Sequence, residues 1–172
     1  MNECEFPPYT YTPGVTPHPV SDPGGHSFGQ RPAPLREADV IELERCAAYR
    51  WGLELFRRGY YWEAHEEWEA VWQALGRHGA VADFVKGLIK LAAAGVKARV
   101  GNGEGVQRHT RRAAELFRSA AAGGVAATGG LSTERLGREA DELGMTTAAW
   151  RPLGDGRAVV FWPGILGRSD RL

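Results

Sequence analysis

The sequence lacks any apolar run long enough to cross a bilayer, for which about 18 consecutive residues are needed. Hydrophobic residues nevertheless make up 43% of its 172 positions, a share too large for a wholly disordered chain. A chain of this length can bury one sizeable core. We therefore expect a globular protein with one main domain and no membrane partner.

An excess of charge of either sign is also lacking, because 21 Lys and Arg residues balance 21 Asp and Glu residues. This balance disfavours a nucleic-acid partner, since proteins that bind nucleic acids usually carry a basic surplus. Two cysteines, Cys4 and Cys46, are too few for a disulfide framework. Residues 1–10 have neither the basic nor the apolar region of a secretory signal. These features predict a cytoplasmic protein with reduced thiols, and they leave a homo-oligomer open.

Proline is scarce over most of the chain and concentrated at one end. Eight of the ten prolines fall within residues 1–34, and proline fixes φ and removes a backbone donor, so this segment cannot form a helix or a central strand. Four aromatic rings are interleaved with these prolines: Phe6, Tyr9, Tyr11 and Phe28. We predict that residues 1–34 form an extended arm laid across a helical body, with these rings buried.

From residue 35 the apolar residues recur every three or four positions, which is typical of amphipathic helices. The pattern predicts five helices, separated by glycine-rich breaks, over residues 37–58, 60–75, 81–100, 105–122 and 132–143. We therefore predict an all-α domain over residues 35–145, an antiparallel bundle with short connections. Residues 146–172 are predicted to be an irregular tail with a short extended segment near residues 157–164.

The predicted second helix carries the most informative pattern. At about 100° per residue, one arc that should face the core holds six residues: Tyr61, Ala64, His65, Trp68, Trp72 and Leu75. Glu69 borders this arc one turn after His65, whereas Glu63 and Glu67 are predicted to face the opposite way. Two ionisable groups on a buried face are costly unless they are paired, hydrogen-bonded or coordinated.

Three explanations of His65 and Glu69 stay open. The two side chains could form a structural hydrogen bond, completed by indole N–H groups of neighbouring tryptophans, and residue statistics favour this explanation. They could bind a divalent metal ion, or they could act in acid–base catalysis. Two ligands fall short of the three that a catalytic zinc takes from protein. The candidates for a third ligand are His109, His18 and His26, whereas His78 is predicted to be solvated.

A longer motif surrounds this pair. His65, Glu69 and Trp72 follow the lead-in Leu55–Glu66 and precede Phe84–Ala92. With this pattern, residues 49–120 resemble the domain of unknown function 309 family, which comprises small helical proteins of bacteria and archaea. The resemblance implies an all-helical fold and a metal-binding role for His65 and Glu69, but no reaction. The chain departs from the family at Lys86 and Lys90, where glutamine is common, and two lysines pointing inward would repel a cation.

Basic residues are concentrated on the third and fourth predicted helices. Lys86, Lys90 and Lys97 lie opposite the apolar face of the third helix, and Lys97–Arg118 holds six basic residues against two acidic ones. The arginines of the fourth helix could bind phosphate or an acidic partner. Alternatively, they could pair with Glu63, Glu66 and Glu67 of the second helix, which is the more common role of such charges.

Two functional hypotheses follow from the sequence. The first is a metal-binding helical protein with His65 and Glu69 as ligands of a divalent ion, and an enzyme of this kind would use metal-dependent hydrolysis. The alternative is a non-catalytic protein-interaction module in which the His–Glu pair is a buried structural hydrogen bond.

Overall fold

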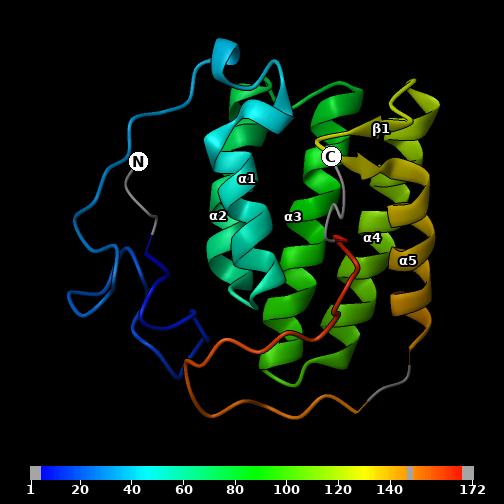
Figure 1. Ribbon diagram of the computed structural model, residues 1–172. Coiled ribbons are helices and arrows are strands. Elements are labelled where there is room, and N and C mark those ends of the chain that lie inside the picture. The colour runs from blue at the N-terminus through cyan, green and yellow to red at the C-terminus, as the bar shows by residue number, and fades with distance from the viewer. Residues whose placement is uncertain (1–4, 147–148, 168–172) are drawn as a thin grey trace.

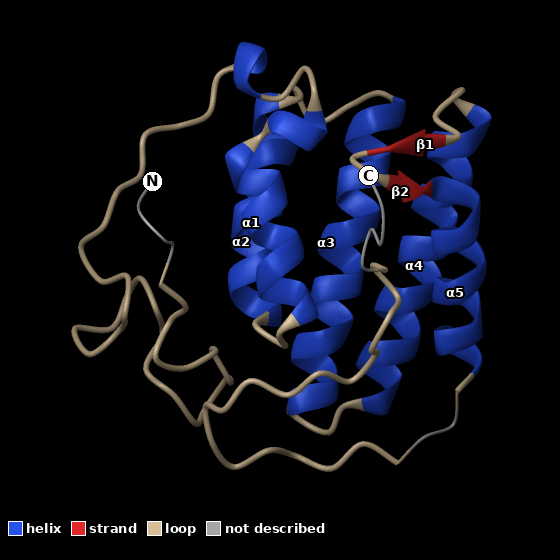
Figure 2. Cartoon of the chain, viewed as in Figure 1, coloured by secondary structure: helices blue, strands red, loops and turns tan. Residues whose placement is uncertain are grey.

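The computed structural model describes residues 5–146 and 149–167 and is all-α, as predicted. Consecutive helices pack side by side in chain order, α1 against α2, α2 against α3, α3 against α4 and α4 against α5 (Figure 1). The bounds are α1 Ala47–Arg57, α2 Tyr61–Ala74, α3 Ala80–Arg99, α4 Gly103–Ala122 and α5 Thr133–Met145. Between α4 and α5 lies a small antiparallel hairpin, β1 Ala127–Thr128 and β2 Leu131–Ser132 (Figure 2).

The first helix begins ten residues later than the sequence predicts. Glu37–Asp39 and Leu43–Arg45 form two 3-10 helices, and the extended backbone of Cys46 separates them from α1. Val40, Leu43 and Cys46 are all buried, and a spacing of three residues places apolar side chains on one face of a 3-10 helix as well as of an α-helix. The periodicity therefore identified the buried residues but not the type of helix.

Glycines allow the helices to approach closely at three places. An added Cβ at Gly52 of α1 would lie 2.4 Å from Nε1 of Trp68, and one at Gly95 of α3 would lie 2.3 Å from the Tyr61 ring. An added Cβ at Gly87 would likewise lie 2.6 Å from the ring of Phe117. The large rings of α2 and α4 thus pack directly on glycines of α1 and α3, where any larger residue would clash with them.

The segments at the two ends of the described chain hold each other against the helices. Figure 1 shows the N-terminal segment beside α1 and α2, and the C-terminal segment running across α3 and α4. The backbone N–H of Thr10 donates to the carbonyl of Gly156 at 2.9 Å. Arg99 of α3 is fully buried and donates to three groups of these segments: Thr12 Oγ1 at 2.9 Å, Asp155 O at 2.9 Å and Arg157 O at 2.8 Å.

The N-terminal segment also covers one face of α2. Glu63 is 6% exposed, and its carboxylate accepts hydrogen bonds from Thr10 Oγ1 at 2.7 Å and from the Tyr11 N–H at 2.8 Å. The prediction that Glu63 faces outward is therefore wrong, because a segment about 50 residues away in sequence covers it. Phe6 lies 4.9 Å from the Trp51 ring, whereas Phe28 is 50% exposed, so its predicted burial is wrong. The division into an arm, a helical domain and a tail remains a prediction.

None of the helices in the described parts of the chain is both long and apolar enough to cross a membrane.

Candidate functional site

His65 lies at the margin of the buried face of α2 rather than at its centre. Its side chain is 30% exposed, and ring Nδ1 lies 3.2 Å from the carboxylate of Glu66. The residues of α2 that the bundle buries are Tyr61, Glu63, Ala64, Trp68 and Val71. Because α2 packs between α1 and α3, its buried arc is rotated toward Val71 and away from His65. The predicted central position of His65 in the core face is therefore wrong.

Glu69 is held by a lysine of the next helix. Its carboxylate lies 3.2 Å from Nζ of Lys86, and the same ammonium group lies 3.6 Å from the centroid of the Trp72 ring. The predicted hydrogen bond between His65 and Glu69 is wrong, since each side chain has a different partner. The indole N–H of Trp68 does not complete such a pair either, because it donates to the carbonyl of Tyr49 at 3.2 Å.

His18 and His26 of the N-terminal segment, predicted as third ligands, contact residues other than His65 and Glu69. The ring of His18 packs on Tyr11 and Trp62, with centroids 4.9 Å and 5.3 Å away. His26 lies 2.9 Å from Ser27 Oγ and 3.4 Å from the Glu63 carboxylate. Within residues 5–146 and 149–167, no three His, Cys, Asp or Glu side chains are grouped so that they could hold a metal ion.

His109, the remaining third-ligand candidate, lies on α4 among cations. Burial is the largest cause that lowers the pKa of His109, and together with the charges of Lys90, Arg108, Lys97 and His65 it brings the pKa to about 4. An imidazole with this pKa is neutral at pH 7. The structure thus brings His65 of α2 and His109 of α4 close enough for their charges to interact, and the other charges that act on His109 are those of lysines and an arginine.

These groups lie on α2, α3 and α4 close enough for their charges to interact, and they are called here the basic face. It comprises seven residues: His65, Lys86, Lys90, Lys97, Arg108, His109 and Arg112. Burial lowers the pKa of Lys90, as do the charges of Lys86 and Arg112, whereas Glu69 raises it. Two cations of the face have carboxylate partners, Lys86 with Glu69 and Arg112 with Glu115.

Other members of the basic face have no ion-pair partner in the parts of the chain that the structure describes. Among the described residues, Lys90, Lys97 and His109 make no side-chain hydrogen bond or ion pair. The sequence contained a signal for this surface, namely the spacing of Lys86, Lys90 and Lys97 on one face of a helix. The sequence alone did not show that His65 and His109 flank these lysines, because that depends on the register between three helices.

The arginines of α4 do not pair with the glutamates of α2. Arg112 pairs with Glu115 at 2.7 Å, and Arg118 pairs with Asp141 of α5. The predicted pairing with Glu63, Glu66 and Glu67 is therefore wrong. Glu63 binds the N-terminal segment and Glu66 contacts His65, whereas burial and the neighbouring Glu66 raise the pKa of Glu67.

The surroundings of His65 and Glu69 do not fit the metal role that the family resemblance implies. The carboxylate that should bind a cation already contacts the Lys86 ammonium, and Glu69 is the carboxylate whose charge acts on Lys90. A divalent ion at this position would lie close to two positive charges, and the energy of like charges at short range opposes binding. The departure from the family pattern at Lys86 and Lys90 therefore has a direct electrostatic consequence.

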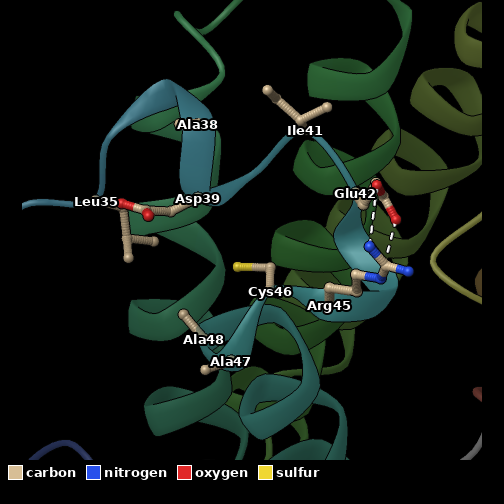
Figure 3. Close-up of a pocket in the computed structure, with 9 residues that line it drawn as sticks. All are labelled: Leu35, Ala38, Asp39, Ile41, Glu42, Arg45, Cys46, Ala47 and Ala48. Carbon is tan, nitrogen blue, oxygen red and sulfur yellow. Dashed lines mark hydrogen bonds and ion pairs between the residues drawn. The ribbon is translucent and has the colours of Figure 1, made fainter.

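A pocket elsewhere in the molecule contains none of these residues. It lies between the two 3-10 helices and the start of α1 (Figure 3). Cys46 lines it, and an ion pair between Arg45 and Glu42 at 3.1 Å lies at one side. The pocket is therefore separate from the residues that the sequence singled out.

The fold and this surface define a small all-α bundle with a partly buried basic face across three of its helices. Residues 49–109 match a family model described as domain of unknown function (DUF309), which confirms the resemblance seen in the sequence. The matched segment covers most of α1, all of α2 and α3 and the start of α4, and so includes His65, Glu69, Lys86, Lys90 and His109. Comparisons with curated proteins and with solved structures give no match.

Proposed function

We propose that this protein is a non-catalytic binding module whose basic face takes an anionic ligand. The observation that carries the proposal is a pair of cations, Lys90 and Lys97, that have no ion-pair partner among residues 5–146 and 149–167 and lie beside the neutral ring of His109. Both lysines are partly buried, and a partly buried charge without a counter-ion is unfavourable. At an effective dielectric constant of about 20, an opposite charge at about 4 Å contributes about 4 kcal/mol before desolvation is subtracted. An anionic ligand would thus stabilise the two lysines of this surface.

The same contacts give less support to a metal-binding function. A metal ion at His65 and Glu69 would have to displace Lys86 from the carboxylate of Glu69. The displaced ammonium would also lose its position over the ring of Trp72, where a cation–π contact contributes about 0.5–2 kcal/mol. An anion beside Lys90 and Lys97 requires neither change.

The extent of the face favours a small ligand over a nucleic acid. Arg112 and Arg118 of α4 are already paired with carboxylates, which reduces the number of cations on this helix that could neutralise phosphates. The chain as a whole has a formal charge of zero. A nucleic-acid site usually needs an extended basic surface that neutralises several phosphates.

Tripolyphosphate is a suitable probe, titrated against the full chain and followed by calorimetry at about 50 and about 200 mM salt. We expect saturable binding that weakens as salt is raised. The double variant Lys90→Gln/Lys97→Gln should weaken binding at least about tenfold. Its matched control is Arg50→Gln/Arg151→Gln, which removes the same charge from exposed positions elsewhere. An equal loss of tripolyphosphate affinity in both variants, or an affinity that does not change with salt concentration, would overturn the proposal.

A further inference from the structure

A more specific site can be located within the basic face. We propose, building on the function above, that it binds a phosphate group over Ala93 of α3, between Lys90 and Lys97 and between the rings of His65 and His109. The ligand class is then a small phosphate monoester. Neither the family match nor the His–Glu motif assigns a site to these residues.

The spacing along α3 brings the two lysines to one position. Lys90, Ala93 and Lys97 are three and four residues apart, so they share one face of the helix. At a rise of about 1.5 Å per residue, the lysines begin about 10 Å apart, and their long flexible side chains can converge between them. Ala93 is only partly buried and carries a single methyl group, so no long side chain occupies the position between them.

The neighbouring helices α2 and α4 contribute groups near this position. The aliphatic part of Lys97 lies against α4, where a Cβ added to Gly105 would be 2.8 Å from Cγ of Lys97. His65 is oriented by Glu66, which contacts its Nδ1 and leaves Nε2 as the nitrogen available to a ligand. His109 of α4 lies close enough to Lys90, Lys97 and His65 for their charges to lower its pKa. Groups of α2, α3 and α4 are therefore within reach of the position over Ala93.

The chemistry of these groups suits a phosphate dianion. Two lysine ammonium groups supply two positive charges and several donors, and the neutral ring of His109 supplies one N–H donor. The donors come from two helices, α3 and α4, and hence from different directions, which suits the tetrahedral arrangement of phosphate oxygens. A carboxylate presents its two oxygens in one plane and can satisfy fewer of these donors at once.

The site can be tested by titrating the full-length, isotope-labelled protein with inorganic phosphate near neutral pH. The ring signals of its five histidines would be followed by NMR. We expect saturable changes at His65 and His109, none at the exposed His78, and binding of acetate that is weaker by at least about tenfold. Acetate binding as tight as that of phosphate would overturn the assignment of the ligand.

A matched pair of substitutions tests the position itself. Ala93→Glu places a negative charge between the lysines and should weaken phosphate binding at least about tenfold. Ala93→Gln adds a side chain of the same size without the charge, so it should retain affinity within about threefold of the parent. Lys90→Gln supplies an independent variant if Ala93→Glu folds poorly in thermal melts followed by circular dichroism.

The outcomes separate this site from the broader function. If tripolyphosphate binding depends on Lys90 and Lys97 while the two Ala93 variants bind phosphate equally well, the site over Ala93 is wrong and the proposed function stands. If neither anion binds the parent protein, both proposals are wrong. If phosphate changes the ring signals of His65 and His109, and Ala93→Glu abolishes these changes whereas Ala93→Gln retains them, the proposed function and the proposed site are both supported.

Discussion

The ammonium group of Lys86 lies 3.2 Å from the carboxylate of Glu69 and 3.6 Å from the centroid of the Trp72 ring. A lysine of α3 thus contacts two of the three residues that form the His–Glu–aromatic motif of α2. The acidic member of the motif is neutralised by a cation of the same protein. This relationship changes the expected chemistry of the surface from cation binding to anion binding.

The metal content of the purified protein should not depend on His65 or Glu69. We expect protein purified without a histidine tag to contain far less than one equivalent of any divalent metal by mass spectrometry. His65→Ala and Glu69→Ala should leave that content unchanged, because Lys86 and Lys90 oppose a cation at this position. The variant Lys86→Gln/Lys90→Gln, which removes the opposing charges, should bind added zinc more tightly than the parent does. A stoichiometric metal that disappears in His65→Ala would contradict this expectation.

Glu63 should matter for stability and for the N-terminal segment. Glu63→Gln replaces an acceptor oxygen by an amide NH₂ facing the Thr10 hydroxyl or the Tyr11 N–H. Because both groups donate to the carboxylate, we expect a loss of about 1–3 kcal/mol in the free energy of unfolding, measured by denaturant titration. Proteolysis of residues 5–30 should become faster. The control Glu66→Gln, at an exposed position of the same helix, should change stability by less than about 0.5 kcal/mol.

Acidification should lower the stability of the fold, because the unfolded chain protonates His109 more readily than the folded protein does. The folded state holds the pKa of His109 at about 4, against an ordinary value of 6.5, so the unfolded chain binds the proton more readily. Stability is therefore lost as the pH falls from about 6.5 toward 4. The ring is partly exposed, so solvent screening reduces the expected effect to about 1–2 kcal/mol. Denaturant titrations should show that His109→Gln has a flatter pH dependence over this range, and identical slopes would contradict the prediction.

The approach of α1 to α2 should depend on Gly52. Gly52→Ala brings a methyl group to 2.4 Å from Nε1 of the buried Trp68, which forces one helix to shift. We expect a loss of about 1–3 kcal/mol in the free energy of unfolding. Gly137→Ala in α5 is the matched control, because its Cβ would meet only an ordinary contact at 3.7 Å from Phe117. That variant should gain up to about 1 kcal/mol from helix propensity, and a similar loss in both variants would exclude the steric explanation.

The helices were predictable because their signals are local. Ser132 was expected to start a helix, and its hydroxyl accepts the N–H of Arg135 at the first turn of α5. Gly59 was expected to end one, and it has a positive φ of 87° after α1. The start of α1 was not predictable in this way. A spacing of three between buried residues fits both an α-helix and a 3-10 helix. The extended backbone of Cys46 separates the 3-10 helices from α1.

The position of His65 was misjudged for a different reason. Periodicity gives the width of an apolar stripe on a helix, but the neighbouring helices decide which part of the helix circumference they cover. Val71 is fully buried and Trp72 is not, which shows that the contact with α1 and α3 rotates the buried arc by part of a turn. His65 moved to the margin for the same reason, where Glu66 could contact it.

The amino-acid sequence by itself determined an all-α chain of five helices and a resemblance to DUF309, since periodicity, glycine breaks and a motif of neighbouring residues need no tertiary information. Only the tertiary structure decided which charges meet. Thr10 reaches Glu63, Lys86 reaches Glu69, and His109 lies beside Lys90, although these partners are between 17 and 53 positions apart. Such contacts depend on the register between packed helices and on the path of the chain ends, and both are fixed by the packing of the whole molecule.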